Sequence, residues 1–424
     1  MKKSTNIYLA TLFAICFLCS VLGGTVSTLM SVYLPVAVRE LLGETTAELN
    51  SISGYINALF IFGWAFGGFT WGVIGDRLGR KKSLLFAITC YGIFTILTGM
   101  MNSWWGVMIC RLLSGFGVGG VAVASYTLLS EVWPQKSKAI VIGILSIAFP
   151  VGIFSAGLIN YIVSSWREGF MVGIIPIALA LIGAFVIKES ENWIDDKNVT
   201  DHRSNTFRIM FSEQHRGDVI SSSLIYGTML ISLWAIFSWL PTWVQSLITD
   251  ADAQKERATS MMLLGMGGLA GGFLSGWIVK AIGIRRSMII GFATCAVLSF
   301  ILFKTNTRFT SLIYLEVGTL SIFFGLNMGI MSGYIPQLFP TQIRATATGF
   351  SLNIGRIFTG LGVLFVGVLV TAMGGYGNAL TIFSMIFICG LFVVLRSSNA
   401  QLRHQTDEST PPITPITPTI VVNK

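Results

Sequence analysis

Long apolar segments separated by short polar segments run along almost the whole chain. Each of twelve apolar segments approaches or exceeds the about 20 residues that a helix needs to cross the hydrocarbon core of a bilayer. The twelve segments lie at residues 8–37, 50–75, 83–101, 104–129, 138–163, 169–187, 218–247, 258–280, 287–304, 310–335, 345–372 and 377–396. This pattern predicts an all-α integral membrane protein with twelve transmembrane helices.

A longer polar stretch at 188–217 divides the twelve segments into two groups of six. We therefore expect a first six-helix half at 1–187, a central loop, and a second six-helix half at 218–397. Residues 398–424 include a run rich in threonine and proline, which predicts a disordered tail.

The composition supports a membrane environment. Hydrophobic residues make up 53% of the chain and charged residues only 11%, whereas soluble domains carry about 25% charged residues. The 46 glycines agree with helices that pack closely in a bilayer. A net charge of +9 also occurs in nucleic-acid-binding proteins, but here the basic residues lie in short loops between apolar segments. The lipid bilayer, and not a nucleic acid, is therefore the expected partner.

The distribution of lysine and arginine predicts the orientation. With a cytoplasmic N-terminus, the inner segments hold twenty of the 28 basic residues. The outer loops then hold only six, which are Arg39, Arg167, Lys255, Arg257, Lys304 and Arg308. Because cytoplasmic loops of membrane proteins are enriched in basic residues, both termini and the central loop are expected in the cytoplasm.

Two landmarks occur once in each half. Residues 72–82 read GVIGDRLGRKK and are echoed about 200 residues later by GWIVKAIGIRR at 276–286. The stretch EVWPQKSKA at 131–139 is likewise echoed by QLFPTQIRA at 337–345. Repeats within one chain are typical of transporter folds built from related halves, so the two six-helix bundles are expected to be pseudo-symmetric.

The same landmarks carry a family resemblance. Residues 72–81 match the pattern G-x3-D-R/K-x-G-R-R/K, and Arg111 begins the pattern R-x3-G-x-G-x-G, which ends at Gly119. In these motifs, and up to about residue 397, the chain resembles the major facilitator superfamily. The resemblance implies a monomeric transporter that works by alternating access in the plasma membrane, here the inner membrane of a bacterium, without a cofactor or metal. No nucleotide-binding motif or catalytic triad is recognisable in the sequence, so an enzyme is not expected.

The first motif combines flexible and charged positions. Gly72 and Gly79 permit a tight turn and a close approach of helices, and Asp76 can accept hydrogen bonds from the N-terminal amides of a neighbouring helix. The resemblance implies that this contact latches the outward-facing state. The residues expected to gate the transporter are Gly72, Asp76, Arg77, Gly79, Arg80 and Glu131. Alternatively, the basic residues of the motif act only as topology determinants.

Three ionisable residues lie well inside apolar segments, where such residues are rare and commonly functional: Arg111, Glu316 and Arg356. Arg356 lies about 11 residues into the eleventh segment, near the bilayer midplane where transporters of this kind bind substrates. Asn353, one turn earlier, shares its helix face. A guanidinium beside an amide suits a carboxylate ligand. In the alternative interpretation, Arg356 pairs with backbone carbonyls or with Glu316 and only orients helices.

Glu316 is the candidate for proton coupling, because a carboxyl group buried in the membrane can take up a proton near neutral pH. Arg111 is its counterpart in the other half and the second proton-coupling candidate. Alternatively, Arg111 and Glu316 form a structural ion pair, and Arg111 serves in helix packing and gating.

Three further residues are candidates for contacting the substrate. Trp239, in the seventh segment, offers an indole that can stack against a ring or a sugar face. Tyr126 and Asn327 add polar groups within other apolar segments. The alternative role of Trp239 is packing.

A narrower resemblance concerns the substrate. Residues 344–357 read RATATGFSLNIGRI and residues 238–244 read SWLPTWV. Both are similar to the corresponding segments of proton-linked organic-acid symporters, including the sialic-acid and aromatic-acid groups, and residues 189–193 resemble an element of sugar porters. The resemblance implies import of a small organic anion, such as sialic acid or another carboxylate, together with protons.

One departure from those symporters affects the coupling. They usually carry acidic residues in the first span, whereas residues 23–28 read GGTVST here. Proton coupling must then rely on another residue such as Glu316, or be absent. Two alternatives stay open: a neutral sugar:proton symporter, and a membrane sensor that binds its ligand without transporting it.

Overall fold

The computed structural model of the protein describes residues 2–43, 46–190, 193–194, 206–248, 252–340 and 343–397. Within these ranges, twelve helical segments are long and apolar enough to cross a membrane. This confirms the prediction of an all-α integral membrane protein with twelve transmembrane helices. The predicted disordered tail at 398–424 and parts of the predicted central loop lie outside the described residues.

The first six spans contain nine helical elements. They are α1 (Lys2–Leu42), α2 (Thr46–Leu78), α3 (Arg80–Met100), α4 (Trp104–Val132), α5 (Gln135–Ser146), α6 (Ala148–Ile162), α7 (Trp166–Gly169), η1 (Phe170–Gly173) and α8 (Ile174–Val186). Helices α5 and α6 together form the fifth span, interrupted at Ile147, and α7, η1 and α8 together form the sixth.

The last six spans are single helices. They are α11 (Arg216–Ser246), α12 (Gln254–Ile282), α13 (Ile284–Thr305), α14 (Leu312–Gln337), α15 (Arg344–Ala372) and α16 (Tyr376–Arg396). The short α10 (Thr206–Met210) precedes them. Since α10 and the first two residues of α11 fall inside 188–217, the segment expected to be a loop is partly helical.

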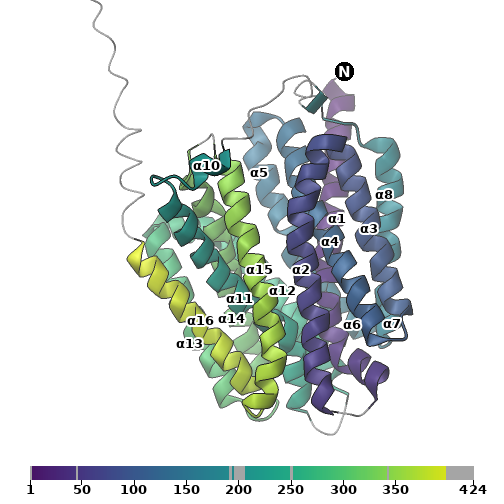
Figure 1. Cartoon of the computed structure of the whole chain (residues 1–424), viewed down its shortest axis with the longest axis vertical. Coiled ribbons are helices and arrows are strands. Elements are labelled where there is room, and N and C mark those ends of the chain that lie inside the picture. Colours follow the sequence, from purple (N-terminus) through teal and green to yellow (C-terminus); the bar gives the residue numbers. More distant parts are fainter. Residues whose placement is uncertain are drawn as a thin grey trace, which may run out of the picture.

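The spans form two bundles, which lie side by side in Figure 1, where the first half runs from purple through blue and the second from teal through green to yellow. Helix α2 packs on α4 in the first bundle, and α12 packs on α14 in the second. The bundles meet mainly where α2 packs on α15 and where α6 packs on α12. We call the side where α1 begins and α16 ends the near side, which is uppermost in Figure 1, and the opposite side the far side.

Glycines allow the helices of one bundle to pack backbone against backbone. A Cβ atom at Gly115 of α4 would overlap the carbonyl oxygen of Phe60 in α2, and one at Gly119 would overlap that of Trp64. Between them, Gly117 faces α3, where a Cβ atom would overlap the backbone of Tyr91. The alternating glycines of the fourth-span motif therefore let α4 approach α2 and α3 at once.

The two bundles are in contact on the far side and diverge toward the near side. Along one face of α15, a Cβ atom at Gly367 would overlap the carbonyl oxygen of Asn50, and one at Gly360 would lie 3.0 Å from the ring of Phe62. On the same face nearer the start of the helix, nothing lies within 4 Å of the Cβ position at Gly349. The space between α2 and α15 therefore opens toward the near side.

Helix α12 shows the same change along its length. A Cβ atom at Gly265 would lie 2.8 Å from the carbonyl oxygen of Pro150 in α6, whereas at Gly268 the nearest atom of Pro150 is 3.8 Å away. At Gly276, nearer the end of the helix, nothing lies within 4 Å. Both inter-bundle contacts thus loosen in the same direction, and the protein adopts a conformation open to the near side.

Candidate functional site

Arg356 lies where the two bundles begin to separate. It is 12 residues from the start of α15, which corresponds to about 18 Å of helix. Its Nη1 donates to Asn353 Oδ1 at 2.9 Å and to the carbonyl oxygen of Leu352 at 3.5 Å. The guanidinium carbon lies 5.0 Å from the ring centroid of Trp64 in α2. Arg356 thus links α15 to the first bundle through a cation–π contact.

The charge of Arg356 is not neutralised within the described part of the chain, where no carboxylate pairs with it. The alternative in which Arg356 pairs with Glu316 is therefore wrong, while a contact with a backbone carbonyl is present. A guanidinium has five N–H donors, and its contacts to Asn353 and Leu352 use only Nη1. The remaining donors are available to a carboxylate.

Aromatic side chains surround this cation. The Trp64 ring lies 5.5 Å from the ring of Trp234 in α11 and 5.4 Å from that of Phe149 in α6. The hydroxyl groups of Tyr126 and Tyr226 are close enough to Arg356 to interact with it electrostatically. Helices of both bundles therefore supply an aromatic wall around a single positive charge.

Arg356, Asn353 and Tyr126 are thus brought together as the sequence led us to expect. Trp64, Trp234 and Tyr226 complete the group without having stood out beforehand. The chain contains 11 tryptophans and 10 tyrosines, and the sequence does not reveal which of them face the meeting of the bundles. The one available signal is the spacing of Tyr226 and Trp234, which are eight residues apart and share a face of α11.

Two predicted substrate contacts lie elsewhere. Asn327 is fully buried between α13 and α14, where its Nδ2 donates to the carbonyl oxygen of Phe323 at 2.9 Å and to Cys295 Sγ at 3.4 Å. Trp239 is also fully buried and packs against Tyr376 of α16, with ring centroids 5.9 Å apart. Both side chains fill space within the second bundle, which corrects the prediction that they line the site of Arg356.

The two proton-coupling candidates are separated as well. Arg111 is buried in the first bundle, donates to the carbonyl oxygens of Val26 at 2.8 Å and Ser27 at 3.4 Å, and stacks on Phe60 at 3.9 Å. Glu316 lies only four residues from the far-side start of α14 and accepts from Asn306 Nδ2 at 2.6 Å. The structural ion pair between Arg111 and Glu316, which was one interpretation of the sequence, is not formed.

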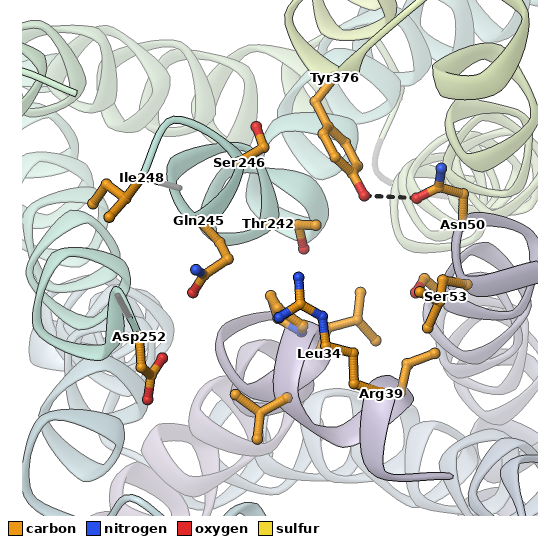
Figure 2. Close-up of a pocket in the computed structure, with 14 residues that line it drawn as sticks. Leu34, Arg39, Asn50, Ser53, Thr242, Gln245, Ser246, Ile248, Asp252 and Tyr376 are labelled. Atoms are coloured by element: carbon orange, nitrogen blue, oxygen red, sulfur yellow. Dashed lines mark hydrogen bonds between the residues drawn. The ribbon is translucent and has the colours of Figure 1, made fainter. Parts of the chain in front are cut away.

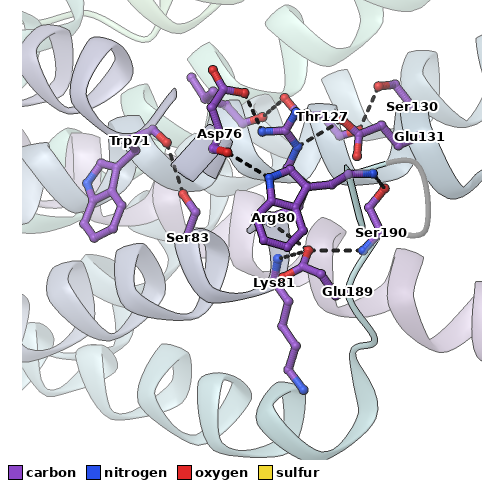
Figure 3. Close-up of polar contacts among 12 residues, drawn as sticks. Trp71, Asp76, Arg80, Lys81, Ser83, Thr127, Ser130, Glu131, Glu189 and Ser190 are labelled. Carbon is purple, nitrogen blue, oxygen red and sulfur yellow. Dashed lines mark hydrogen bonds and ion pairs between the residues drawn. The ribbon is translucent and has the colours of Figure 1, made fainter. Parts of the chain in front are cut away.

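Three of the predicted gating residues, Asp76, Arg80 and Glu131, form a network at the near side of the first bundle (Figure 3). Arg80 Nη1 lies 2.6 Å from Asp76 Oδ1, and Arg80 Nε lies 3.0 Å from Glu131 Oε1. All three side chains are partly buried, so the charges are screened less than at an open surface. The network ties the end of α2 to the start of α3 and the end of α4.

Glu189, which was not among the predicted gating residues, completes this network (Figure 3). Its Oε1 accepts from the backbone N–H groups of Arg80 at 2.7 Å and Lys81 at 3.0 Å. Glu189 is therefore the carboxylate found at the N-terminal amides of α3. Gly79 has a φ of 106°, and a Cβ atom there would overlap Glu189. Only glycine fits this turn beside the Glu189 carboxylate.

A cavity of about 710 Å³ lies between the bundles on the far side. Residues of α1, α2, α11 and α16 and of the segment before α12 line it (Figure 2), among them Arg39, Asn50, Ser53, Thr242, Gln245, Asp252 and Tyr376. Tyr376 donates its hydroxyl hydrogen to Asn50 Oδ1 at 2.6 Å, so a hydrogen bond joins the two bundles at one edge of the cavity.

Sequence comparison places this arrangement among known transporters. Residues 14–363 match the family model of the Major Facilitator Superfamily. The chain belongs to the major facilitator superfamily. This membership accounts for the two six-helix bundles, the motif at 72–81 and the glycine motif that begins at Arg111, and it makes the protein a multi-pass membrane transporter of small molecules rather than an enzyme.

Relatives within the superfamily transport organic acids. The sialic acid transporter NanX of Escherichia coli is 29% identical over 320 residues, which cover 73% of this chain and 75% of NanX. The cis,cis-muconate transport protein of Acinetobacter baylyi is 26% identical over 368 residues, covering 84% of this chain and 88% of that protein. The crystal structure of a D-xylose–proton symporter shares the fold, with a TM-score of 0.75, 18% identity, and coverage of 92% of this chain and 98% of that one.

Proposed function

We propose that this transporter of the major facilitator superfamily imports a small organic anion, such as sialic acid or another carboxylate, into a bacterial cell. The observation that carries the proposal is the guanidinium of Arg356, which has no carboxylate partner among the described residues and lies at the meeting of the bundles. Arg356 is partly buried, and a charge withdrawn from water without a counterion is unfavourable, so an anionic substrate would be favoured at this place.

The shape of the site suits a carboxylate attached to a ring or to an unsaturated chain. The free donors of Arg356 can bind both oxygens of a carboxylate. The indoles of Trp64 and Trp234, which are 7% and 5% exposed, add an apolar aromatic surface beside these donors. The relatives that transport sialic acid and cis,cis-muconate support this substrate class.

The near side corresponds to the cytoplasm in this proposal, and the membrane is the bacterial inner membrane. The near-side segments carry most of the lysine and arginine residues, which supports a cytoplasmic location by the positive-inside rule. The conformation in which α2 and α15 separate at Gly349 is then inward-facing. One chain contains both bundles and the Arg356 site between them, so a monomer is sufficient for transport.

Uptake by proteoliposomes tests the proposal. The purified protein should import radiolabelled sialic acid or cis,cis-muconate, and it should not import D-xylose. Import of D-xylose with no uptake of either anion would instead support the neutral-sugar alternative. Binding of an anion without any counterflow of labelled substrate would contradict transport and support the sensor alternative.

We also propose that uptake is coupled to protons and that Glu316 takes up the proton. Its position one turn from the far-side end of α14 is compatible with protonation from outside. Because Glu316 contacts Asn306 and not Arg356, coupling would act through movement of α14 and not through direct contact with the substrate.

The variant Glu316→Gln keeps the hydrogen-bonding shape and cannot lose a proton. It should lose accumulation of the anion driven by a pH gradient while keeping exchange of labelled for unlabelled anion. Glu256→Gln, in the first turn of α12 on the same side, is the matched control and should accumulate the anion normally. Accumulation by Glu316→Gln at the wild-type level would exclude Glu316 as the coupling residue.

A further inference from the structure

We propose that the far-side cavity is a second binding site for the transported organic anion, separate from the site of Arg356, with Arg39 as the residue that binds its carboxylate. The identity of the ligand rests on the function proposed above, whereas the existence of the site rests on the cavity itself. In a protein open to the near side, this cavity is the place where an anion arriving from the far side can bind.

Arg39 supplies an unpaired positive charge in the cavity. It lies in the last turn of α1, and Figure 2 shows its guanidinium extending between the bundles toward Thr242 and Gln245 of α11. In the described ranges, its side chain forms no hydrogen bond or ion pair. A basic residue near a helix C-terminus also stabilises the helix dipole, but that role does not require the side chain to extend into a cavity.

Among the described residues that line the cavity, Asp252 is the one acidic residue, and it does not cancel this charge. Asp252 Oδ1 lies 2.8 Å from Nη1 of Arg257, whose side chain is only 1% exposed. Gln245 Oε1 also accepts from the same nitrogen of Arg257. Since Asp252 already neutralises Arg257, the charge of Arg39 is in excess among the described lining residues, and the cavity is suited to an anion.

The cavity also offers hydroxyl and amide groups for the remainder of a ligand. Thr242 is 8% exposed, and its buried hydroxyl has no hydrogen-bond partner. Ser53 is 6% exposed and lines the same space from α2. An unsatisfied buried hydroxyl costs free energy unless a ligand or water completes its hydrogen bond. The volume of about 710 Å³ lies within the range typical of small-molecule sites, about 300–1,000 Å³.

Both bundles contribute residues to the far-side site. Because the bundles move relative to each other during transport, the site can form and open within the transport cycle. Arg39 and Ser53 come from the first bundle, whereas Thr242 and Tyr376 come from the second. The hydrogen bond between Tyr376 and Asn50 joins the bundles beside the cavity. An anion bound there is held while the Arg356 site is open to the near side, and it can move inward once the far-side contacts separate.

Isothermal titration calorimetry of the purified full-length protein tests the second site, with sialic acid and cis,cis-muconate as the probes. The wild-type protein should bind two equivalents of one of these anions. Arg356→Ala and Arg39→Gln should each bind one, and the double variant should bind none. Thr242→Val, which removes only the hydroxyl, should weaken the remaining site of Arg356→Ala by about tenfold. Arg308→Gln, a far-side loop arginine outside the cavity lining, should behave as the wild type.

The failure of this proposal differs from the failure of the proposed function. The far-side site would be overturned if the wild type bound only one equivalent of anion, if Arg356→Ala lost this binding and if Arg39→Gln kept it. The proposed organic-anion function would then remain intact. Absence of binding of both anions by the wild type, together with absence of their uptake, would overturn the proposed function and with it the ligand named here. Thermal unfolding of each variant, matched to the wild type, excludes misfolding as the cause of lost binding.

Discussion

Arg356→Ala is expected to abolish uptake of the organic anion. The change removes the guanidinium beside Trp64 and Asn353, and with it the charged donors available to a carboxylate at this site. A hydrogen bond to a charged group contributes about 1.5–3 kcal/mol, so loss of two should weaken binding at least about a hundredfold. Initial rates of uptake into proteoliposomes, measured over a range of anion concentrations, check this result.

Two variants separate a binding role for Arg356 from a structural one. Arg356→Lys keeps the charge and loses the planar fork, so it should retain partial uptake with a raised KM. Arg344→Ala removes an exposed arginine at the near-side start of the same helix and should transport normally. Near-wild-type uptake by a folded Arg356→Ala protein would exclude Arg356 as the substrate-binding residue.

The fold could be predicted from the sequence because the bilayer constrains it strongly. Backbone polar groups must be satisfied within each span, so an apolar segment of about 20 residues indicates a helix with little ambiguity. The motif at 72–81 and the glycines after Arg111 also indicated the family to which the chain belongs. The glycines have an identifiable physical reason, since Cβ atoms at Gly115 and Gly119 would overlap the backbone of α2.

The candidate site was predicted only in part. A sequence shows how deep a residue lies along a transmembrane helix, but it does not show toward which neighbour its side chain points. Arg356 and Asn353 were correctly placed together, since they are three residues apart on one helix. Asn327 and Trp239 lie in apolar segments too, but they face neighbouring helices of their own bundle. Within such apolar spans, the hydrophobic pattern does not distinguish the faces that point to lipid, to another helix or to a substrate.

Contacts between distant segments explain the remaining differences. Glu189 reaches the start of α3 across 109 residues of sequence, so only the folded chain shows that it binds the amides there. Arg39 had been counted only as an outer basic residue, and its place in the far-side cavity depends on how α1 meets α11. Residues that act through contacts between segments far apart in the sequence therefore required the structure.

Gly367→Leu is expected to prevent closure of the far side and to stop the transport cycle. Even a Cβ atom at this position would overlap the carbonyl oxygen of Asn50, so a leucine must push α15 away from α2. Overpacking of this kind costs about 1–3 kcal/mol, which shifts the population of the near-side-open state by about 5- to 150-fold. Spin labels at Arg77→Cys and Arg344→Cys, near-side ends of α2 and α15, should move closer together in a background without the six native cysteines.

Gly349→Leu is the matched control, because Gly349 lies on the same face of the same helix with nothing within 4 Å of its Cβ position. It adds the same side chain to the membrane-spanning segment, so the effect on hydropathy is equal. The label distance should stay long in this variant, because a leucine there opposes closure of the near side instead. Both variants should transport slowly, since alternating access requires both closures. A wild-type distance and wild-type uptake in Gly367→Leu would show that the contact of α15 with Asn50 does not hold the far side closed.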